Sequence, residues 1–279
     1  MGEQPLRVVQ WTTGYVGQQA VKEIVRRPDL ELVGVFAHDP AKVGRDAAEL
    51  CGLDEPTGVL ATNDEAALLA LAPDCVSYNR LHIDPDEVAR ILAAGVNVVT
   101  TSEFLTGYGI GPEATAKIAA GAAAGGATIL GTGVNPGFAE LFAAVGAGIS
   151  RNIRKLTLSE SADITLFAND PNFTGVGWNR PGGEPGHAAD VEQATIVFGD
   201  ALEELAGLMG LTLDERRCTV TFAHATEDLE IPGMTIPAGH VAGMDVDWDG
   251  LIDGQVRIGV HQRWAIGDKI EPPLPVEFG

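Results

Sequence analysis

The 279-residue sequence predicts an α/β fold, in which a doubly wound parallel sheet is followed by an α+β region with an antiparallel sheet. Three observations predict it. An apolar β-type run over residues 6–11 enters a glycine-containing turn and then a helical pattern over residues 15–25. Strand and helix patterns then alternate up to about residue 135. Beyond that point apolar and polar residues alternate with a period of two, which is typical of half-buried antiparallel strands.

The N-terminal turn has the features that bind a pyrophosphate. Its spacing, Thr12-x-Gly14-x-x-Gly17, matches the dinucleotide fingerprint G-x-G-x-x-G, except that threonine replaces the first glycine. Glycine lets the backbone approach the anion, while free N–H groups and the helix dipole bind it. A turn glycine in any strand–helix unit is the plainer interpretation. Because a second strand pattern follows at residues 31–36, we favour a Rossmann-type dinucleotide-binding domain. The expected pyrophosphate contacts are Thr12, Thr13, Gly14, Tyr15, Val16 and Gly17.

The elements that follow carry recognisable boundary signals. Helix patterns over residues 63–71, 84–95 and 112–124 alternate with strand patterns over residues 74–79, 96–101 and 127–130. The second of these helices has Asp84 as its N-cap and Pro85 in its first turn. In open α/β sheets, ligands bind at the carboxyl ends of the strands. We therefore expect Tyr78, Asn79 and Thr101 to meet the ribose and nicotinamide of the dinucleotide.

The loop after residues 31–36 should lie beside the adenosine ribose. Asp39 there favours a free 2′-hydroxyl, whereas His38, Lys42 and Arg45 favour a 2′-phosphate. Alternatively, Asp39 caps a short helix. We assign His38 and Lys42 to cofactor binding and expect NADP or NAD, with a slight preference for NADP.

The second half of the chain has a different rhythm. Helix patterns cover residues 139–149 and 194–208, and strand patterns cover residues 155–164, 217–223, 240–248 and 254–264. A loop rich in Asn, Gly and Pro joins the first strand to the second helix. We expect a dinucleotide-binding domain at residues 1–135 and an α+β domain for substrate binding and oligomerisation at residues 136–279.

The composition excludes several classes of function. There are 18 Lys and Arg against 39 Asp and Glu, so the net charge is −21 and the surface repels nucleic acid and anionic lipid. The three cysteines, Cys51, Cys75 and Cys218, lack the spacing of a metal site, and we expect no bound metal. Apolar stretches are broken by glycine and polar residues, so we expect a cytoplasmic protein without a membrane span.

Four segments together resemble the dihydrodipicolinate reductase-like oxidoreductases, and within them the 2,4-diaminopentanoate dehydrogenase and native amine dehydrogenase branch. They are residues 7–17 (RVVQWTTGYVG), 42–50 (KVGRDAAEL), 97–103 (NVVTTSE) and 131–138 (GTGVNPGF). The resemblance covers the first half of the chain strongly and the second half in outline.

Two departures from that family bear on function. The lysine-pathway reductases carry a catalytic His-His-x-x-Lys run, but the corresponding region here, residues 159–169, has neither histidine nor lysine. This difference argues against dihydrodipicolinate reduction itself. Members of the amine dehydrogenase branch usually continue beyond the point where this sequence stops, so the resemblance implies either a shortened form or a fragment of a longer gene.

Glu103 is the expected catalytic residue. It follows the strand at residues 96–101, where the nicotinamide should lie, and the resemblance places the branch's catalytic glutamate there. A carboxylate at this position can take a proton from ammonium, return one to departing water and stabilise an iminium cation. The alternative is a solvent-facing or helix-capping carboxylate.

Other site residues are less sharply indicated. Asn135 either bonds the nicotinamide carboxamide or stabilises the turn before Pro136. For the substrate wall we expect Phe138, Phe167, Asn169, Trp178 and His261. Aromatic residues of such domains more often belong to the core.

These observations lead to one principal function and two alternatives. We expect an NAD(P)-dependent oxidoreductase that interconverts a small amine and a ketone plus ammonia. A non-catalytic nucleotide-binding or sensory protein is the first alternative, and a reductase of a cyclic imine or C=C bond is the second. The expected partners are a small-molecule amine or ketone, with no nucleic acid and no membrane, and a second copy of the chain in a homodimer.

Overall fold

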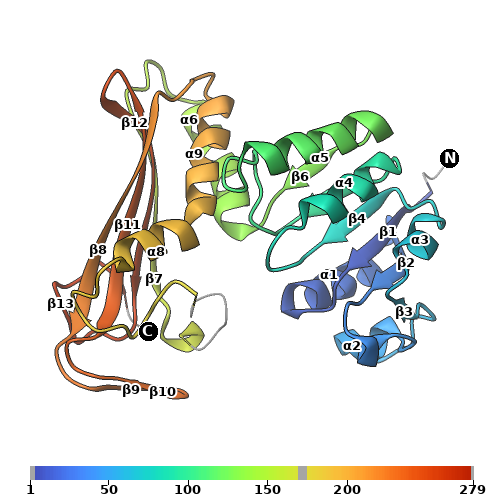
Figure 1. The fold of residues 1–279 in the computed structure, drawn as a ribbon, viewed down its shortest axis with the longest axis horizontal. Coiled ribbons are helices and arrows are strands. Elements are labelled where there is room, and N and C mark those ends of the chain that lie inside the picture. The colour runs from blue at the N-terminus through green and yellow to red at the C-terminus, as the bar shows by residue number, and fades with distance from the viewer. Residues whose placement is uncertain (1–3, 169–174, 278–279) are drawn as a thin grey trace. The chain divides into compact units, whose positions relative to one another are not determined.

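The computed structural model describes residues 4–168 and 175–277. The chain forms two compact units, residues 1–133 and residues 134–279 (Figure 1). Within the described residues, no helix combines the length and the apolar character needed to cross a membrane.

The first unit is built on a six-stranded sheet in which every neighbouring pair is parallel. Its strands are β1 (Leu6–Trp11), β2 (Leu30–Phe36), β3 (Ala61–Thr62), β4 (Cys75–Tyr78), β5 (Asn97–Thr100) and β6 (Ile129–Gly131). The order β3-β2-β1-β4-β5-β6 reverses direction between β1 and β4. In doubly wound sheets of this order, dinucleotides bind at that reversal. The predicted doubly wound sheet is confirmed.

Helices cover both faces of this sheet (Figure 1). They are α1 (Tyr15–Arg26), the 3₁₀ turn η1 (Pro40–Lys42), α2 (Ala47–Cys51), α3 (Glu65–Leu69), α4 (Pro85–Ala93) and α5 (Pro112–Gly125). Side chains of α1 and α2 belong to one apolar cluster, and those of α3, α4 and α5 belong to another. The second cluster contains Trp11, whose ring stacks on Phe36 with centroids 4.3 Å apart. Burial on two faces explains why these strands read as continuous apolar runs.

Several helix starts in this unit follow the capping signals of the sequence. Asp84 accepts hydrogen bonds from the backbone N–H groups of Asp86 and Glu87, and Pro85 occupies the first turn of α4. Asp39 accepts a hydrogen bond from Ala41 N at 2.9 Å and so caps η1. For Asp39, capping was the alternative to contact with the adenosine ribose, and the structure shows the cap.

The most heavily bonded cap, Asp46 at the start of α2, provides a stability prediction. Its carboxylate accepts hydrogen bonds from Ala48 N, from Thr57 N and Oγ1, and from Gly58 N. Burial works against the ionised form, but these bonds outweigh it and lower the pKa of Asp46 to about 2. A carboxyl with a lowered pKa stabilises the fold above its unfolded pKa, and that stability is lost as the pH falls through the folded value. We expect Asp46→Asn to cost about 1–2 kcal/mol at neutral pH, with the difference from wild type narrowing between about pH 4 and pH 2.

Chemical denaturation across that pH range tests this expectation. The matched control is Asp64→Asn at the start of α3, because Asp64 accepts a single bond, from Ala67 N. Equal losses in the two variants, or a difference from wild type that does not depend on pH, would contradict the role given to Asp46.

The second unit is a five-stranded sheet with helices. Its strands are β7 (Leu156–Asp163), β8 (Glu215–Ala225), β11 (Val241–Ile252), β12 (Gln255–Ala265) and β13 (Ile270–Glu271), in the order β13-β8-β11-β12-β7. Strands β9 (Leu229–Ile231) and β10 (Met234–Ile236) form a separate hairpin. The helical segments are η2 (Val134–Phe138), α6 (Ala139–Ala147), η3 (Thr165–Phe167), α8 (His187–Ala194) and α9 (Ile196–Leu208).

One face of this sheet is packed by α9. Trp248 of β11 lies against Gly199, where an added Cβ would be 2.7 Å from the indole ring. The indole N–H of Trp248 donates to Thr195 Oγ1 at 3.1 Å, and Leu202 and Leu205 are fully buried. The close helix–sheet contact therefore requires a residue without a side chain at position 199.

The structure adds two features to the predicted α+β arrangement. Strand β7 pairs with β12 in parallel, so the sheet is mixed although its other pairs are antiparallel. Helix α8 begins directly after Gly186, between the expected loop and the helix expected from residue 194, and the sequence pattern did not indicate it. Its buried face is short, with His187 and Val191 buried, so its periodicity is weak.

Candidate active site

The N-terminal turn has an unusual backbone at its first position. Thr12 has φ of +78°, a left-handed conformation that glycine adopts most easily. Two hydrogen bonds hold it there: Thr12 Oγ1 donates to the Asn79 carbonyl, and Gln10 Nε2 donates to the Thr12 carbonyl, each at 3.0 Å. The fingerprint's first glycine is therefore replaced by a threonine whose side chain anchors the turn.

The two remaining glycines of the turn have different surroundings. A Cβ added to Gly17 would collide with the Thr12 carbonyl and lie 2.9 Å from Gln10 Nε2. A Cβ added to Gly14 would meet nothing within 4 Å. Gly17 is required by packing inside the unit, whereas Gly14 borders open space.

That open space suits the phosphates of a dinucleotide. Gly14 is the N-cap of α1 and no side chain caps the helix, so its first N–H groups are free to bind an anion. Tyr15 and Val16 are exposed at this edge. Lys42 brings a positive charge to the turn, because its Nζ donates to Thr13 Oγ1 at 3.0 Å and to the Thr13 carbonyl at 3.3 Å. The residues present fit a nicotinamide dinucleotide held by its pyrophosphate.

The carboxyl ends of β1, β4 and β5 are joined by one hydrogen-bond network. Asn79 Oδ1 accepts bonds from Gln10 Nε2 at 2.9 Å and from Ser77 Oγ at 3.0 Å. Asn79 Nδ2 donates to Thr101 Oγ1 at 2.9 Å. The structure thus brings together three predicted cofactor residues, Thr12, Asn79 and Thr101, at the reversal point of the sheet.

The position of Tyr78 corrects the sequence-based expectation. Its side chain is fully buried, and its hydroxyl donates to Glu87 Oε2 at 2.7 Å inside the unit. Successive side chains of a strand point to opposite faces, so Tyr78 enters the core while Ser77 and Asn79 do not. Its side chain does not reach the ligand edge of the sheet. His38 is exposed and packs edge-on against Phe36.

Glu103 has a partner that the sequence analysis missed. The ring Nδ1 of His82 lies 2.9 Å from Glu103 Oε1 and 3.0 Å from Oε2. The glutamate side chain is 32% exposed and the histidine 75%, so the pair is open to solvent on the histidine side. The two residues follow β4 and β5, whose carboxyl ends meet at the same edge. A histidine shortly beyond the predicted strand end was the available signal.

In the second unit, Asn135 and Phe138 line a pocket of about 450 Å³. Phe138 and Phe142 supply apolar surface, and both are largely exposed. Glu160 of β7 supplies a carboxylate, which accepts hydrogen bonds from Asn135 Nδ2 and from the Trp264 indole N–H. Asn135 is therefore engaged by a side chain of its own unit, and the lining combines apolar side chains with Asn135, Glu160 and two serines.

Of the other expected substrate residues, Phe167, Trp178 and His261 are described, and none of the three lines this pocket. Trp178 is 7% exposed and is corrected to a core residue. His261 is also corrected to a structural position: its Nδ1 lies 3.2 Å from Asp247 and its Nε2 lies 3.0 Å from Asp249 on the neighbouring strand. Phe167 is half-exposed in η3, and Asn169 lies outside the described residues.

A buried carboxyl near this pocket was also missed. Glu140 of α6 is fully buried, and neither of its carboxyl oxygens has a hydrogen-bond partner among the described residues. Burial, together with the charges of Glu204 and Glu160, raises the pKa of Glu140 to about 8. The charged form is therefore disfavoured in the folded protein.

Glu140 should make stability depend on pH. Because its folded pKa lies above its unfolded value, the unfolded chain releases this proton first, and stability falls as the pH rises from about 4.5 to about 8. We expect Glu140→Met to be more stable than wild type by about 1–3 kcal/mol near pH 9, with the gain shrinking toward about pH 4.5. Chemical denaturation at several pH values measures this difference in the free energy of unfolding, and Glu113→Met, at an exposed position, is the control. A gain that is the same at every pH would contradict the assignment.

Known proteins resemble this chain in sequence and in fold. No family model matches the chain. An amine dehydrogenase of Streptomyces virginiae is 28% identical over 283 residues, which cover 97% of this chain and 78% of that protein. A 4-hydroxy-tetrahydrodipicolinate reductase of Trichormus variabilis is 33% identical over 107 residues, or 36% of this chain and 38% of that protein.

Solved structures share the fold. The amine dehydrogenase from Mycobacterium smegmatis matches with a TM-score of 0.77 at 24% identity, over 94% of this chain and 79% of that one. The resemblance to the dihydrodipicolinate reductase-like oxidoreductases, in their amine dehydrogenase branch, is confirmed. GenD2 from gentamicin A biosynthesis, solved in complex with NAD, matches the chain with a TM-score of 0.57 at 17% identity, over 96% of this chain and 68% of that one.

Proposed function

We propose that this NAD(P)-dependent oxidoreductase interconverts a small amine and the corresponding ketone plus ammonia. The observation that carries the proposal is the Glu103–His82 pair, at the sheet edge where Asn79 and Thr101 already converge. A carboxylate there can handle the protons of ammonia chemistry beside a nicotinamide ring. The curated relative aligned along 97% of the chain bears the name amine dehydrogenase.

The residues of the glycine turn would hold and orient the cofactor. The free N–H groups at the start of α1 and the Lys42 ammonium are suited to the pyrophosphate and to a nearby phosphate. When bound, the cofactor supplies the hydride, and the protein supplies position and electrostatics. We also propose a slight preference for NADP over NAD. This preference rests on Lys42, whose ammonium lies at the turn. Arg45 does not add to it, because its guanidinium is already paired with Glu49.

Glu103 would carry the protons of the reaction. It takes one proton from ammonium, which frees ammonia to attack the ketone carbon. It then gives that proton to the hydroxyl group of the carbinolamine, which leaves as water and yields the iminium cation. Negative charge on Glu103 stabilises this cation as it accepts hydride. Glu103 thus ends each turnover as a carboxylate, and the bond to His82 holds that carboxylate in place.

The substrate class follows from the size and polarity of the available surface. The pocket beside Phe138 is small and largely apolar, so we propose ketones and amines with short hydrocarbon substituents. We also propose a homodimer, which light scattering of the purified protein would test.

The proposal is tested by following NADH and NADPH with a panel of small ketones, with and without ammonium. Cofactor oxidation that requires both ketone and ammonium is the expected result. Oxidation without ammonium would indicate a carbonyl reductase instead. Cofactor binding without turnover of any ketone or amine would favour a nucleotide-binding protein that lacks catalysis.

A further inference from the structure

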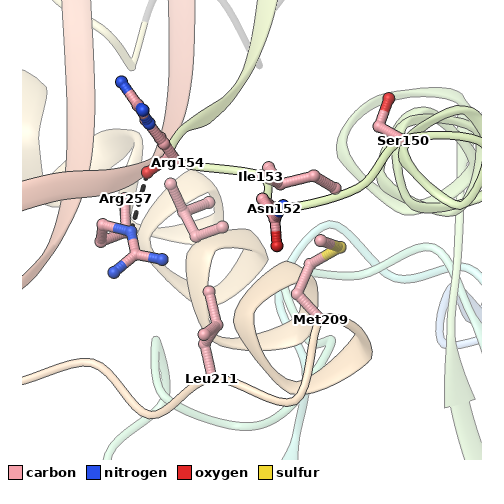
Figure 2. Close-up of a pocket in the computed structure, with 8 residues that line it drawn as sticks. Ser150, Asn152, Ile153, Arg154, Met209, Leu211 and Arg257 are labelled. Carbon is pink, nitrogen blue, oxygen red and sulfur yellow. Dashed lines mark hydrogen bonds between the residues drawn. The ribbon is translucent and has the colours of Figure 1, made fainter.

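A second pocket lies in the second unit, between the start of β7, the end of α9 and β12. Its volume is about 210 Å³, which is below the roughly 300 Å³ at which drug-sized sites begin. Residues 150, 152–154, 209, 211 and 257–258 line it (Figure 2). None of these residues belongs to the site described above, so any ligand here serves another purpose.

The charge around this pocket is opposite to that of the molecule. The chain carries a net charge of −21, yet Arg154 and Arg257 line this pocket, and Arg151 and Lys155 are neighbours in sequence of its lining residues. Among the described residues, none of the four forms an ion pair. Other arginines of the same unit each pair with a carboxylate, namely Arg180, Arg216, Arg217 and Arg263. Unpaired cations clustered in an acidic protein favour an anion at this place.

Arg257 is the cation that faces the pocket. Its Nε donates to the Arg154 carbonyl at 2.8 Å, and this bond orients the guanidinium. Its two Nη groups have no partner within the described part of the chain. In Figure 2 the side chain of Arg154 extends away from the Arg257 guanidinium, so Arg154 contributes its main chain to the pocket. The Asn152 amide lines the same pocket and also lacks a described partner.

The remaining lining decides what kind of anion fits. Ile153, Met209, Leu211 and Ile258 give the pocket an apolar wall. Inorganic phosphate is charged on every side, and placing its oxygens against this wall would cost their hydration. A planar guanidinium matches the two oxygens of a carboxylate, and the apolar wall matches a hydrocarbon chain. We propose that this pocket binds a short aliphatic carboxylate, with its carboxylate on Arg257 and Asn152 and its chain on Met209 and Leu211.

The test is calorimetric titration of the full-length protein with pentanoate, using pentanamide and inorganic phosphate as comparison ligands. We expect one pentanoate per chain, with pentanamide and phosphate at least about tenfold weaker, because the first lacks the charge and the second lacks the apolar part. Arg257→Gln should weaken pentanoate binding by about tenfold or more. Arg151→Gln removes the same charge from a residue that is next in sequence to the lining residues 150 and 152 but does not itself line the pocket, and it should leave the affinity within about twofold.

Several outcomes would overturn the proposal. They are no pentanoate binding by the wild-type protein, unchanged binding by Arg257→Gln, and equal binding of pentanamide or phosphate. Because the readout is binding and not turnover, the result is independent of whether the proposed amine chemistry is correct.

Discussion

Replacing Glu103 by glutamine is expected to lower amine oxidation and ketone amination by about 10²–10⁴-fold, the usual contribution of a general acid–base group. Glutamine keeps the size of the side chain and can still bond to His82, but it cannot take up or release a proton at neutral pH. Steady-state rates, together with fluorescence titration of NADPH, measure the two consequences separately. Cofactor affinity should stay within about twofold of wild type, because the glycine turn and Lys42 are unchanged.

His82→Gln is the matched comparison for this variant. It removes the ring that bonds to Glu103 while leaving the carboxylate in place, so we expect a smaller loss of about tenfold. Full activity in Glu103→Gln would remove this carboxylate from the mechanism. A loss of activity that merely parallels a loss of cofactor binding would reassign Glu103 to binding.

Gly14→Ala should lose cofactor affinity but keep its stability, whereas Gly17→Ala should lose stability. A methyl group added at Gly14 would stand in open space in the free protein, so the free energy of unfolding should change by no more than about 0.5 kcal/mol. It would occupy the place that the pyrophosphate requires, and cofactor affinity should fall at least about tenfold. A methyl group added at Gly17 would meet the Thr12 carbonyl and the Gln10 amide, which are themselves held in the hydrogen-bond network. We expect Gly17→Ala to cost about 1–3 kcal/mol of stability.

Thermal unfolding with and without NADPH distinguishes the two variants. Added cofactor should raise the melting temperature of wild type but hardly that of Gly14→Ala, although their melting temperatures without cofactor are similar. Gly17→Ala should already melt lower without cofactor. Normal NADPH binding by Gly14→Ala would mean that the pyrophosphate lies elsewhere, and the proposed function would lose its structural basis.

Much of the first unit could be predicted because its signals are local. Capping by Asp84 and Pro85 depends on neighbouring residues, and both act in the structure as the sequence indicates. The strand pairing of the second unit was harder to predict from the sequence. The parallel pairing of β7 with β12 joins residues about 100 positions apart, and no local pattern specifies it.

The candidate site shows the same division at the level of side chains. Tyr78 and Asn79 are adjacent in sequence, and both were expected at the ligand edge, but the pleat of β4 sends Tyr78 into the core. His82 was missed because its importance depends on its distance from Glu103, 21 residues later. Glu140 was missed because burial without a partner is a property of packing, which helix periodicity does not reveal.

Periodicity, capping and turn chemistry act over a few residues, so they were enough to predict the doubly wound sheet, the glycine turn and a carboxylate after the fifth strand. Folding of the whole chain was needed to show which side chains meet: Thr12 with Asn79, His82 with Glu103, and Arg257 with an apolar wall. Those contacts arise from strands and loops far apart in the chain, and side-chain direction and burial are set only when the sheets are packed.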